Sequence, residues 1–372
     1  MKWSWKVAEV AGIGIYIHWT FLILVAWVLV VEASQGGSMA TALWGVALVL
    51  AVFACVVLHE LGHALTAKRY GILTRDITLL PIGGVARLER IPEEPRQELW
   101  VALAGPAVNG VIAVGLIAVI YAMEGLAPFS RFALVGGHFL VNLAFANVIL
   151  GAFNLLPAFP MDGGRVLRAL LAERMDYVRA TQIAANVGQA MAVVFGVLGF
   201  FLNWLLLFVA LFVYLGAQQE AQAVEARSLL RGVPVRDAMI TRFRPLSENA
   251  RLADVLPELL AGDQQDFPVV QDERILGMLT RNALLTALAE GGQDVRVAQV
   301  MHRDCGAVDE SDMLEKTFEQ MRQSKCPAMP VLRSGRVVGM ITLENVGEWM
   351  MIQSALRQAR ARHRVDNIFR TD

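Results

Sequence analysis

The sequence predicts a polytopic α-helical membrane protein of about six spans with a short membrane-associated β-hairpin, joined to a cytoplasmic α/β module. Composition is the first observation: 56% of the 372 residues are hydrophobic and the mean hydropathy is +0.49, which is unusually apolar for a soluble protein. The second is distribution, because the apolar excess lies before residue 220 and the remainder has ordinary charge. The third is a repeat with an offset of 62 residues in that charged part.

Six apolar runs predict the membrane spans. They cover Gly14 to Val31, Ala42 to Ala67, Leu99 to Tyr121, Phe132 to Phe153, Ile183 to Phe201 and Leu202 to Leu215. Only Asn203 separates the last two runs, so they form either a tight hairpin or one interrupted helix. We expect no cleavable signal peptide, because the first run is long enough to remain as a span and lacks a clear cleavage site.

Basic residues predict the orientation of these spans, since short cytoplasmic connections are enriched in lysine and arginine. Such residues precede the first span and follow the second and fourth: Lys2, Lys6, Lys68, Arg69, Arg75, Arg87, Arg90, Arg96, Arg165, Arg168, Arg174 and Arg179. The opposite connections hold Arg131 alone. We therefore expect an integral protein of a prokaryotic-type plasma membrane, with both termini and the charged module in the cytoplasm.

The second apolar run contains His59-Glu60-Leu61-Gly62-His63. On a helix, residues four apart share a face, so both histidine rings can bind one metal ion while Glu60 lies beside the open coordination position. Acidic and basic side chains cost about 2.5 to 3.5 kcal/mol each in a membrane helix, so such a cluster is a functional site by default. The alternative is a pair of core histidines with a glutamate that has no catalytic role.

A catalytic zinc usually has three protein ligands and one water molecule, so the motif predicts a third ligand elsewhere. Asp162 is the best candidate, because it lies between a turn with prolines at 157 and 160 and a new helix. The prolines prevent a continuous helix, and the two glycines after Asp162 permit unusual backbone angles, so its carboxylate can turn inward. The alternative is that Asp162 is the N-cap of a helix from Gly163 to Glu173.

Three segments together resemble the site-2 protease family of intramembrane zinc metalloproteases. They are HELGH within a span, AGPAVN at residues 104–109 at the start of the next span, and NLLPAFPMDGG at residues 154–164. The resemblance extends over about residues 10 to 215. It implies a zinc metalloendopeptidase of the HExxH type that cleaves a transmembrane segment of a membrane-protein substrate. Met161 stands where the family more often has leucine, an apolar exchange that leaves the catalytic residues intact.

The same resemblance implies the roles of the site residues. It implies that His59, His63 and Asp162 bind zinc. It also implies that Glu60 is the general base and that Asn154 helps to position the scissile carbonyl or its oxyanion. Water must reach a site inside the bilayer, and we expect the path to be lined by Asn109, Asn142, Asn147 and Asn154.

The connection from Ile72 to Arg90 has β-branched residues on both sides of a turn that contains Pro81, Gly83 and Gly84, which predicts a short hairpin. A strand edge beside an intramembrane active site is suited to binding substrate as an added strand, since a helical substrate must unwind before cleavage. The alternative is a surface hairpin that only caps the second span.

The charged part contains two copies of one pattern of strands and helices. Val235-Arg-Asp-Ala-Met239 matches Val297-Ala-Gln-Val-Met301, Phe267-Pro268 matches Met329-Pro330, and Gly277-Met-Leu-Thr280 matches Gly339-Met-Ile-Thr342. These copies resemble a tandem pair of CBS domains, which implies clefts for adenine nucleotides and a homodimer formed through the CBS modules. Ala283 and Asn345 stand where ribose-binding copies usually have aspartate, so we expect nucleotide binding to be weak or confined to one cleft.

The predicted organisation has five parts. They are a transmembrane zinc metalloprotease domain at 1–217, a linker at 218–228, CBS modules at 229–290 and 291–352, and a basic tail at 353–372. Because the linker is short and helical, a shape change in the CBS pair can alter proteolysis. The tail either rests on anionic lipid headgroups or is a solvated helix end.

The three cysteines have no metal or redox spacing. Cys55 lies in a span, and Cys305 and Cys326 suit free thiols in a reducing cytosol better than a disulfide. The expected partners are the lipid bilayer and a membrane-protein substrate, with no nucleic acid. A competing function is a metal or ion transporter gated by the CBS pair. However, the membrane part shows no internal repeat, and a transporter needs no glutamate at position 60. A catalytically silent relative is disfavoured by the intact motifs.

Overall fold

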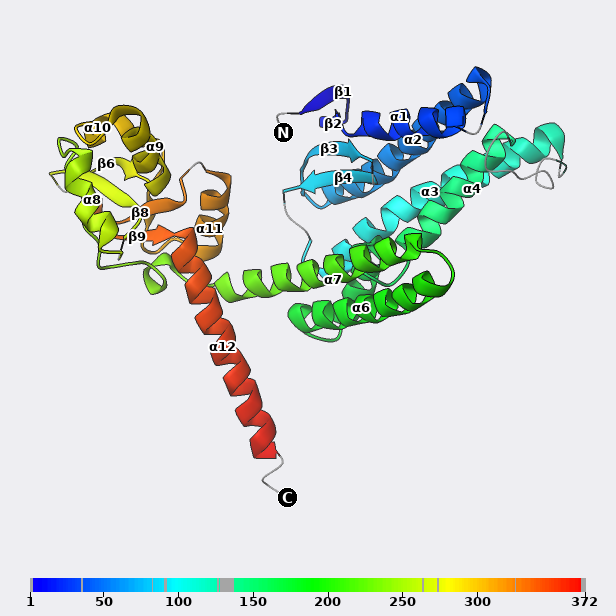
Figure 1. Ribbon diagram of the computed structural model, residues 1–372. Helices are drawn as coiled ribbons and strands as arrows, with labels where there is room; N and C mark the ends of the chain where they lie inside the picture. Colours follow the sequence, from blue (N-terminus) through cyan, green and yellow to red (C-terminus); the bar gives the residue numbers. More distant parts are fainter. Residues whose placement is uncertain are drawn as a thin grey trace. The chain divides into compact units, whose positions relative to one another are not determined.

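The computed structural model describes residues 3–34, 36–81, 83–89, 92–125, 127, 137–262, 264–272, 274–324 and 326–368, with side chains as far as 357 and at 359. It divides into two compact units, Met1–Val224 and Glu225–Asp372 (Figure 1). Several basic residues used for the predicted orientation and tail lie outside the described residues: Lys2, Arg90, Arg131 and Arg370. The side chains of Arg360, Arg362 and Arg364 are likewise not described.

The first unit contains a four-stranded sheet in the order β1-β2-β3-β4, formed by Ser4–Val10, Ile13–His18, Thr74–Leu80 and Gly83–Leu88. β2 and β3 are parallel, and the other two pairs are antiparallel. The first predicted span is therefore wrong at its start, because residues 14–18 lie in β2 and helix α1 covers only Phe21–Ser34. The β-branched isoleucines of β2 favour a strand, and pairing with β3 stabilises it.

The connection after the second predicted span contains β3 and β4, with Leu80 opposite Gly83 at the turn. These strands are not an isolated hairpin, because β3 also pairs with β2 from Gly14 opposite Asp76 onward. Within the described residues β4 is an edge strand, so one side of its backbone has no partner strand.

Four helices of the described residues are long and apolar enough to cross a membrane: α2 Met39–Arg69, α3 Pro95–Glu124, α6 Tyr177–Phe201 and α7 Leu205–Leu230. α1 and α4 (Phe139–Asn154) are apolar but shorter, with 14 and 16 residues. The structure thus supports four long spans where the sequence analysis expects six. α1 is short because β2 takes the start of its apolar run, and residues 132–136 of the fourth predicted span are not described.

α6 and α7 are separate helices, joined by the three residues 202–204. Gly199 permits their close approach at this turn, since a Cβ atom there would lie 2.9 Å from the Leu207 nitrogen. α7 continues without a break through residues 218–228, so the predicted linker is the end of a span-length helix.

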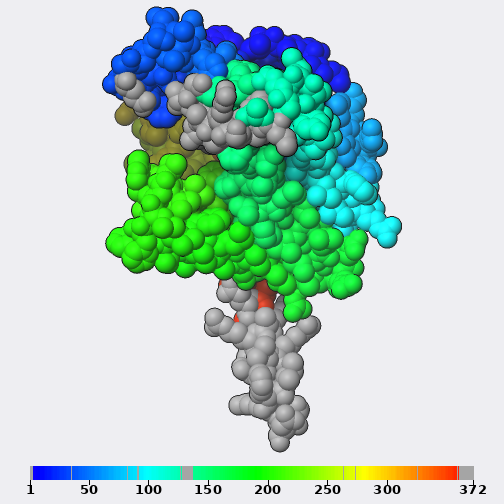
Figure 2. Space-filling model, turned by 90° about the vertical axis from the view of Figure 1, so that its right-hand side faces the viewer, coloured from blue at the N-terminus to red at the C-terminus, as the bar shows by residue number. Residues whose placement is uncertain are grey.

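Small residues bring the helices that carry the HELGH and AGPAVN motifs together. A Cβ atom at Gly62 of α2 would lie 2.9 Å from the Ala104 carbonyl oxygen of α3, so the two backbones are almost in contact. The short helix α5, Asp162–Ala172, packs against α3 and α6. The turquoise and green surfaces of α3, α4, α6 and α7 adjoin in the space-filling view (Figure 2). The HELGH segment therefore lies against the first half of α3.

The second unit repeats one set of elements, and corresponding elements are 62 residues apart, as Leu252 and Leu314 are at the starts of α8 and α11. The pairs are α8 Leu252–Leu260 with α11 Leu314–Gln323, β5 Phe267–Gln271 with β8 Ala328–Arg333, β6 Arg274–Leu279 with β9 Arg336–Thr342, and α9 Arg281–Gly291 with the start of α12 Leu343–Ile368. Short helices, η2 Val235–Asp237 and α10 Val297–Val300, open the copies, and β7 Val308–Asp309 pairs with β8. The α/β repeat is confirmed.

The opening segment of each copy lies in the hydrophobic core of the other copy. Val235 at the start of the first copy packs in one cluster with Val331 of the second. Val297 at the start of the second copy packs with Phe267 of the first. The two copies therefore share their cores, and neither sequence repeat contains a complete core of its own.

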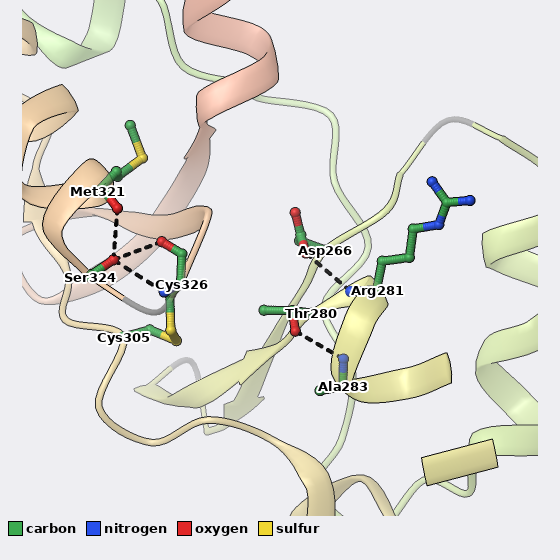
Figure 3. The surroundings of a disulfide bond; sticks show 8 residues. All are labelled: Asp266, Thr280, Arg281, Ala283, Cys305, Met321, Ser324 and Cys326. Atoms are coloured by element: carbon green, nitrogen blue, oxygen red, sulfur yellow. Dashed lines mark hydrogen bonds between the residues drawn. A yellow bond between two sulfur atoms is a disulfide. The ribbon is translucent and has the colours of Figure 1, made fainter. Parts of the chain in front are cut away.

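Cys305 and Cys326 form a disulfide, so the expectation of free thiols is wrong for these residues (Figure 3). They are 21 residues apart in the sequence, but folding brings their Cα atoms within 5.4 Å. Ser324 orders the loop before β8, because its hydroxyl accepts the Cys326 N–H and lies 2.8 Å from the Cys326 carbonyl oxygen. Cys55 of α2 is a buried free thiol.

Candidate metal centre

Three potential ligand atoms from α2 and α5 converge in the first unit. The Nε2 atoms of His59 and His63 are 3.1 Å apart, and Oδ2 of Asp162 lies 3.2 Å and 3.1 Å from them respectively. All three residues are buried, with exposed fractions of 5%, 5% and 8%. Tetrahedral zinc with bonds of about 2.0 to 2.2 Å separates adjacent ligand atoms by roughly 3.3 Å. The observed triangle therefore has nearly the size that zinc requires.

The other ring nitrogen of each histidine faces a hydrogen-bond acceptor. Nδ1 of His59 lies 2.5 Å from Oδ1 of Asn109, and Nδ1 of His63 lies 2.6 Å from the Val101 carbonyl oxygen. Each Nδ1 therefore carries the proton and donates it, which leaves a lone pair on each Nε2. Two lone pairs and a carboxylate pointing at one another repel unless a cation lies among them. The donor set fits zinc in its chemistry as well as in its size.

Asp162 is the first residue of α5, and Met161 occupies the N-cap position. The Asp162 carboxylate points to the two histidines, so its interpretation as a helix cap is wrong. The helix starts in tight contact with the preceding turn. A Cβ atom at Gly163 would lie 2.2 Å from the Leu156 carbonyl oxygen, so only glycine fits there. The glycines after Asp162 thus allow α5 to pack against the preceding turn, and they do not give the backbone an unusual conformation.

A cavity of about 540 Å³ opens at the three converging side chains. Glu60, Asn154 and Arg165 line it, together with residues 83–86 of β4. β4 approaches Glu60 closely, because a Cβ atom at Gly84 would lie 2.8 Å from the Glu60 Cγ atom. The structure thus brings every predicted site residue to one cavity and adds an edge strand to its wall.

Comparisons with known proteins agree with this geometry. Residues 47–195 match the sequence profile of Peptidase family M50, and residues 235–290 and 297–351 each match that of the CBS domain. A zinc metalloprotease of Methanocaldococcus jannaschii is 36% identical over 282 residues, which cover 75% of this chain and 78% of the relative. The chain belongs to peptidase family M50. The resemblance to site-2 proteases, and to tandem CBS domains, is confirmed.

Two further comparisons place this M50 chain among its relatives. Stage IV sporulation protein FB of Bacillus subtilis is 25% identical over 247 residues, covering 64% of this chain and 82% of the relative. The solved structure of the site-2 protease from Methanocaldococcus jannaschii is 38% identical and covers 59% of this chain and 95% of that one, with a TM-score of 0.44. As an M50 member whose described residues include four span-length helices, the chain is an integral membrane zinc metalloprotease.

Sequence reasoning missed the residues that orient the histidines of this M50 site. Behind His59, the Asn109 amide donates to Oδ1 of Asn147 at 2.9 Å, and the Asn147 amide donates to the Leu143 carbonyl oxygen at 2.9 Å. Asn109 and Asn147 were expected to line a water path; Asn109 does line the cavity, and both side chains are buried in this hydrogen-bonded chain. Their positions in adjacent apolar runs were a signal of function, whereas their partners depend on how α3 and α4 pack.

Gly105 of the AGPAVN segment is a second residue whose role only the structure shows. A Cβ atom at this position of α3 would lie 2.2 Å from Nε2 of His63 and 2.6 Å from Nε2 of His59. Any side chain there would therefore occupy the space in front of the two lone pairs. Glycine keeps that space open for a ligand of the histidines.

Proposed function

We propose that this M50 protease cuts a transmembrane segment of another membrane protein, in regulated intramembrane proteolysis. One observation carries the proposal: on a helix of span length, two Nε2 lone pairs converge with the Asp162 carboxylate. His59, His63 and Asp162 hold the zinc. Because His59 and His63 lie on an apolar helix of span length and all three ligands are buried, the scissile bond must enter the protein beside this helix to reach them.

The other cavity residues have chemical roles in the proposed reaction. Zinc bound at this site supplies electrophilic activation of water and of the scissile carbonyl. Glu60 takes the proton from the attacking water and delivers it to the leaving amine, as its place on the cavity wall allows. Asn154, at the end of α4, donates its amide hydrogen to the carbonyl oxygen and so holds the developing negative charge.

Strand β4 is proposed to bind the substrate in an extended conformation. It is an edge strand of the described sheet, and residues 83–86 line the cavity that contains Glu60. An unwound stretch of substrate that pairs with β4 would satisfy its own backbone hydrogen bonds and pass the ligands. This supports the substrate-binding alternative over a hairpin that only caps α2.

The proposed topology places both termini and the CBS pair in the cytoplasm, as the distribution of basic residues predicts. The domain boundaries proposed from the sequence are 1–217, 218–228, 229–290, 291–352 and 353–372. The CBS pair modulates proteolysis, either by binding an adenine nucleotide or by forming a homodimer. The unbroken course of α7 across residues 218–228 supports such coupling, because a helix transmits a shift along its axis.

The test compares purified full-length wild type with Asp162→Ala, Glu60→Gln and a control, Glu173→Gln, whose side chain is exposed at the end of α5. Each is incubated in detergent with single-span membrane proteins, and its zinc content is measured. We expect Asp162→Ala to lose zinc and cleavage, Glu60→Gln to keep zinc and lose cleavage, and the control to keep both. Full zinc occupancy in Asp162→Ala would remove that residue from the ligand set. Metal or ion flux into sealed vesicles without any cleavage by wild type would favour the transporter.

A further inference from the structure

Arg168 of α5 is a fully buried cation with two carboxylate partners. Its exposed fraction is 0%. Its Nε atom donates to Oε1 of Glu98 on α3 at 2.8 Å, and its Nη1 atom donates to Oε1 of Glu220 on α7 at 2.6 Å. The rings of Phe159 and Tyr177 lie 4.9 Å and 5.0 Å from the guanidinium carbon. The four helices α3, α5, α6 and α7 and the turn before α5 therefore meet at one charge.

A buried ion-pair cluster costs desolvation free energy. Replacing such a cluster with apolar side chains of similar volume often leaves a protein equally stable or more stable. Such clusters are best explained where a defined geometry matters, because an ion pair accepts fewer arrangements than an apolar contact does. The guanidinium of Arg168 has a planar set of donors, and two of them are directed at Glu98. The cluster thus specifies the position of α5 relative to α3.

That position matters for the metal centre. Glu98 precedes Val101 by three residues, so both lie on one face of α3, and the Val101 carbonyl oxygen accepts the hydrogen bond that orients His63. Arg168 lies on the same short helix as Asp162. The Glu98–Arg168 pair therefore joins the helix that orients one ligand to the helix that carries another.

The start of α5 and its surroundings form one tightly packed block. A Cβ atom at Gly164 would lie 2.6 Å from the Phe159 nitrogen, and the Phe159 ring covers the Arg168 guanidinium. Because this packing is tight, a displacement of Arg168 also displaces Asp162. Glu220 adds α7 to this block, and α7 runs on to Leu230.

We propose that Arg168, Glu98 and Glu220 are positioning residues for the Asp162 ligand, and that Glu220 makes the geometry of the metal centre depend on α7. This rests on the proposed function, in which Asp162 binds zinc. None of the three touches substrate; they act through α5. In the full chain, a shift of α7 along its axis reaches Asp162 through the Glu220–Arg168 ion pair.

The test uses Glu220→Gln in the full-length protein in detergent, because glutamine keeps the shape and the acceptor oxygen but removes the charge. The matched control is Glu173→Gln, which makes the same change at an exposed position of the α5 C-terminus. The readouts are zinc affinity by competition with a chelator, the visible spectrum of the cobalt-substituted protein, and kcat and KM for cleavage. We expect zinc affinity to fall about tenfold, with a changed cobalt spectrum, a lower kcat and an unchanged KM. The control should match wild type.

Two further measurements distinguish a positioning role from a purely structural one. The first is thermal unfolding of the metal-free proteins. The second is zinc binding by Arg168→Lys, which keeps the charge but loses the planar donors. A variant that melts earlier but binds zinc like wild type in its folded fraction would overturn the proposal. So would a Glu220→Gln protein whose affinity and cobalt spectrum match the control, while Asp162→Ala loses zinc as expected. If wild type binds no zinc, or Asp162→Ala keeps wild-type affinity, the proposed function fails first and this inference fails with it.

Discussion

At the residue scale, hydrogen bonds on the far side of each imidazole decide which nitrogen is free to bind metal. Asn109 and the Val101 carbonyl oxygen accept from the two Nδ1 atoms, so both Nε2 atoms present lone pairs toward Asp162. Metal-binding histidines depend on such partners for ring orientation and basicity. These partners are as much part of the centre as the ligands themselves.

The first prediction tests the partner of His59. Asn109→Ala removes the acceptor for Nδ1, so the ring can rotate or change tautomer, and zinc affinity should fall by about 10- to 100-fold. Chelator competition on the purified protein measures it. Asn186→Ala, at an exposed position of α6, is the control and should bind zinc like wild type. Unchanged affinity in Asn109→Ala would show that packing alone holds the His59 ring.

The second prediction concerns pH and the CBS unit. Burial raises the pKa of the Asp266 carboxyl above its ordinary value of 3.8; the Arg281 N–H opposes this, and the charge of Glu344 adds to it. The folded unit therefore holds this proton more tightly than the unfolded chain. Protonated Asp266 therefore contributes its full stabilisation when the pH is below its ordinary pKa. That stabilisation is lost as the pH rises through the higher pKa of the folded state.

Asp266→Asn keeps an acceptor for the Arg281 N–H, shown in Figure 3, but cannot titrate. We expect the free energy of unfolding of wild type, relative to the variant, to decline as pH rises from the ordinary value through the folded pKa. Urea unfolding of the CBS segment over a pH series measures this difference. A difference that stays constant or grows with pH would contradict the sign.

At the scale of elements, the contact between β4 and α2 controls the space around Glu60. Gly84 lies so close to the Glu60 side chain that β4 forms a wall of the catalytic cavity. The same strand has an edge available for pairing. In the proposed reaction, β4 therefore both limits the movement of Glu60, the general base, and offers a backbone template for substrate.

The third prediction adds one methyl group to that wall. Gly84→Ala should displace the Glu60 side chain, so cleavage falls about 10- to 100-fold while zinc content is retained, since misplacement by about 1 Å can have this effect. Initial cleavage rates and metal analysis measure the two effects. Gly110→Ala is the control, because a Cβ atom there meets nothing within 4 Å. Equal rates in the two variants would show that Glu60 tolerates the contact.

At the scale of the whole molecule, two units of different chemistry are joined by one continuous helix. The first contains the buried metal centre, and the second is a repeat with shared cores. α7 begins in the first unit and ends in the second, where Leu230 enters the hydrophobic core. The end of α7 therefore packs within the CBS unit, as the proposed modulation of proteolysis by the CBS pair requires.

The fourth prediction tests the topology. Single cysteines introduced at Gly37 and Ala127 should be labelled by an impermeant reagent from outside intact cells, because the connections near them carry few basic residues. A cysteine at Ser228 should be labelled only after permeabilisation. External labelling at Ser228 would reverse the orientation and place the CBS pair away from cytoplasmic nucleotides.

The fifth prediction concerns the disulfide of the CBS unit. Replacing Cys305 and Cys326 together by alanine should lower the free energy of unfolding of this unit by about 3 kcal/mol, since a loop of some 20 residues is no longer closed in the unfolded chain. Thermal unfolding with and without a reductant measures it. Wild type with reductant should behave like the variant without it. Insensitivity of wild type to reductant would show that the bond contributes no stability.

Local patterns were enough to identify the chemistry and the class of fold. The spacing of His59 and His63 on a helix, Glu60 between them and Asp162 beside glycines follow from ligand chemistry, which permits few residue types. The repeat likewise predicted the α/β elements of the second unit. Span boundaries were less certain because apolar composition does not separate a strand such as β2 from the helix after it.

The sequence by itself determined the protease family and predicted the three zinc ligands, because the HELGH and NLLPAFPMDGG segments each have diagnostic residue types at short spacings. Only the tertiary structure decided the partners of the histidines, the meeting of Glu98, Arg168 and Glu220, and the disulfide. It also decided the exchange of opening segments between the CBS copies. These features join residues 21 to about 120 positions apart, and no local periodicity encodes which of many buried groups will meet. Their geometry is set by the close packing of small residues between helices, which is a property of the folded chain.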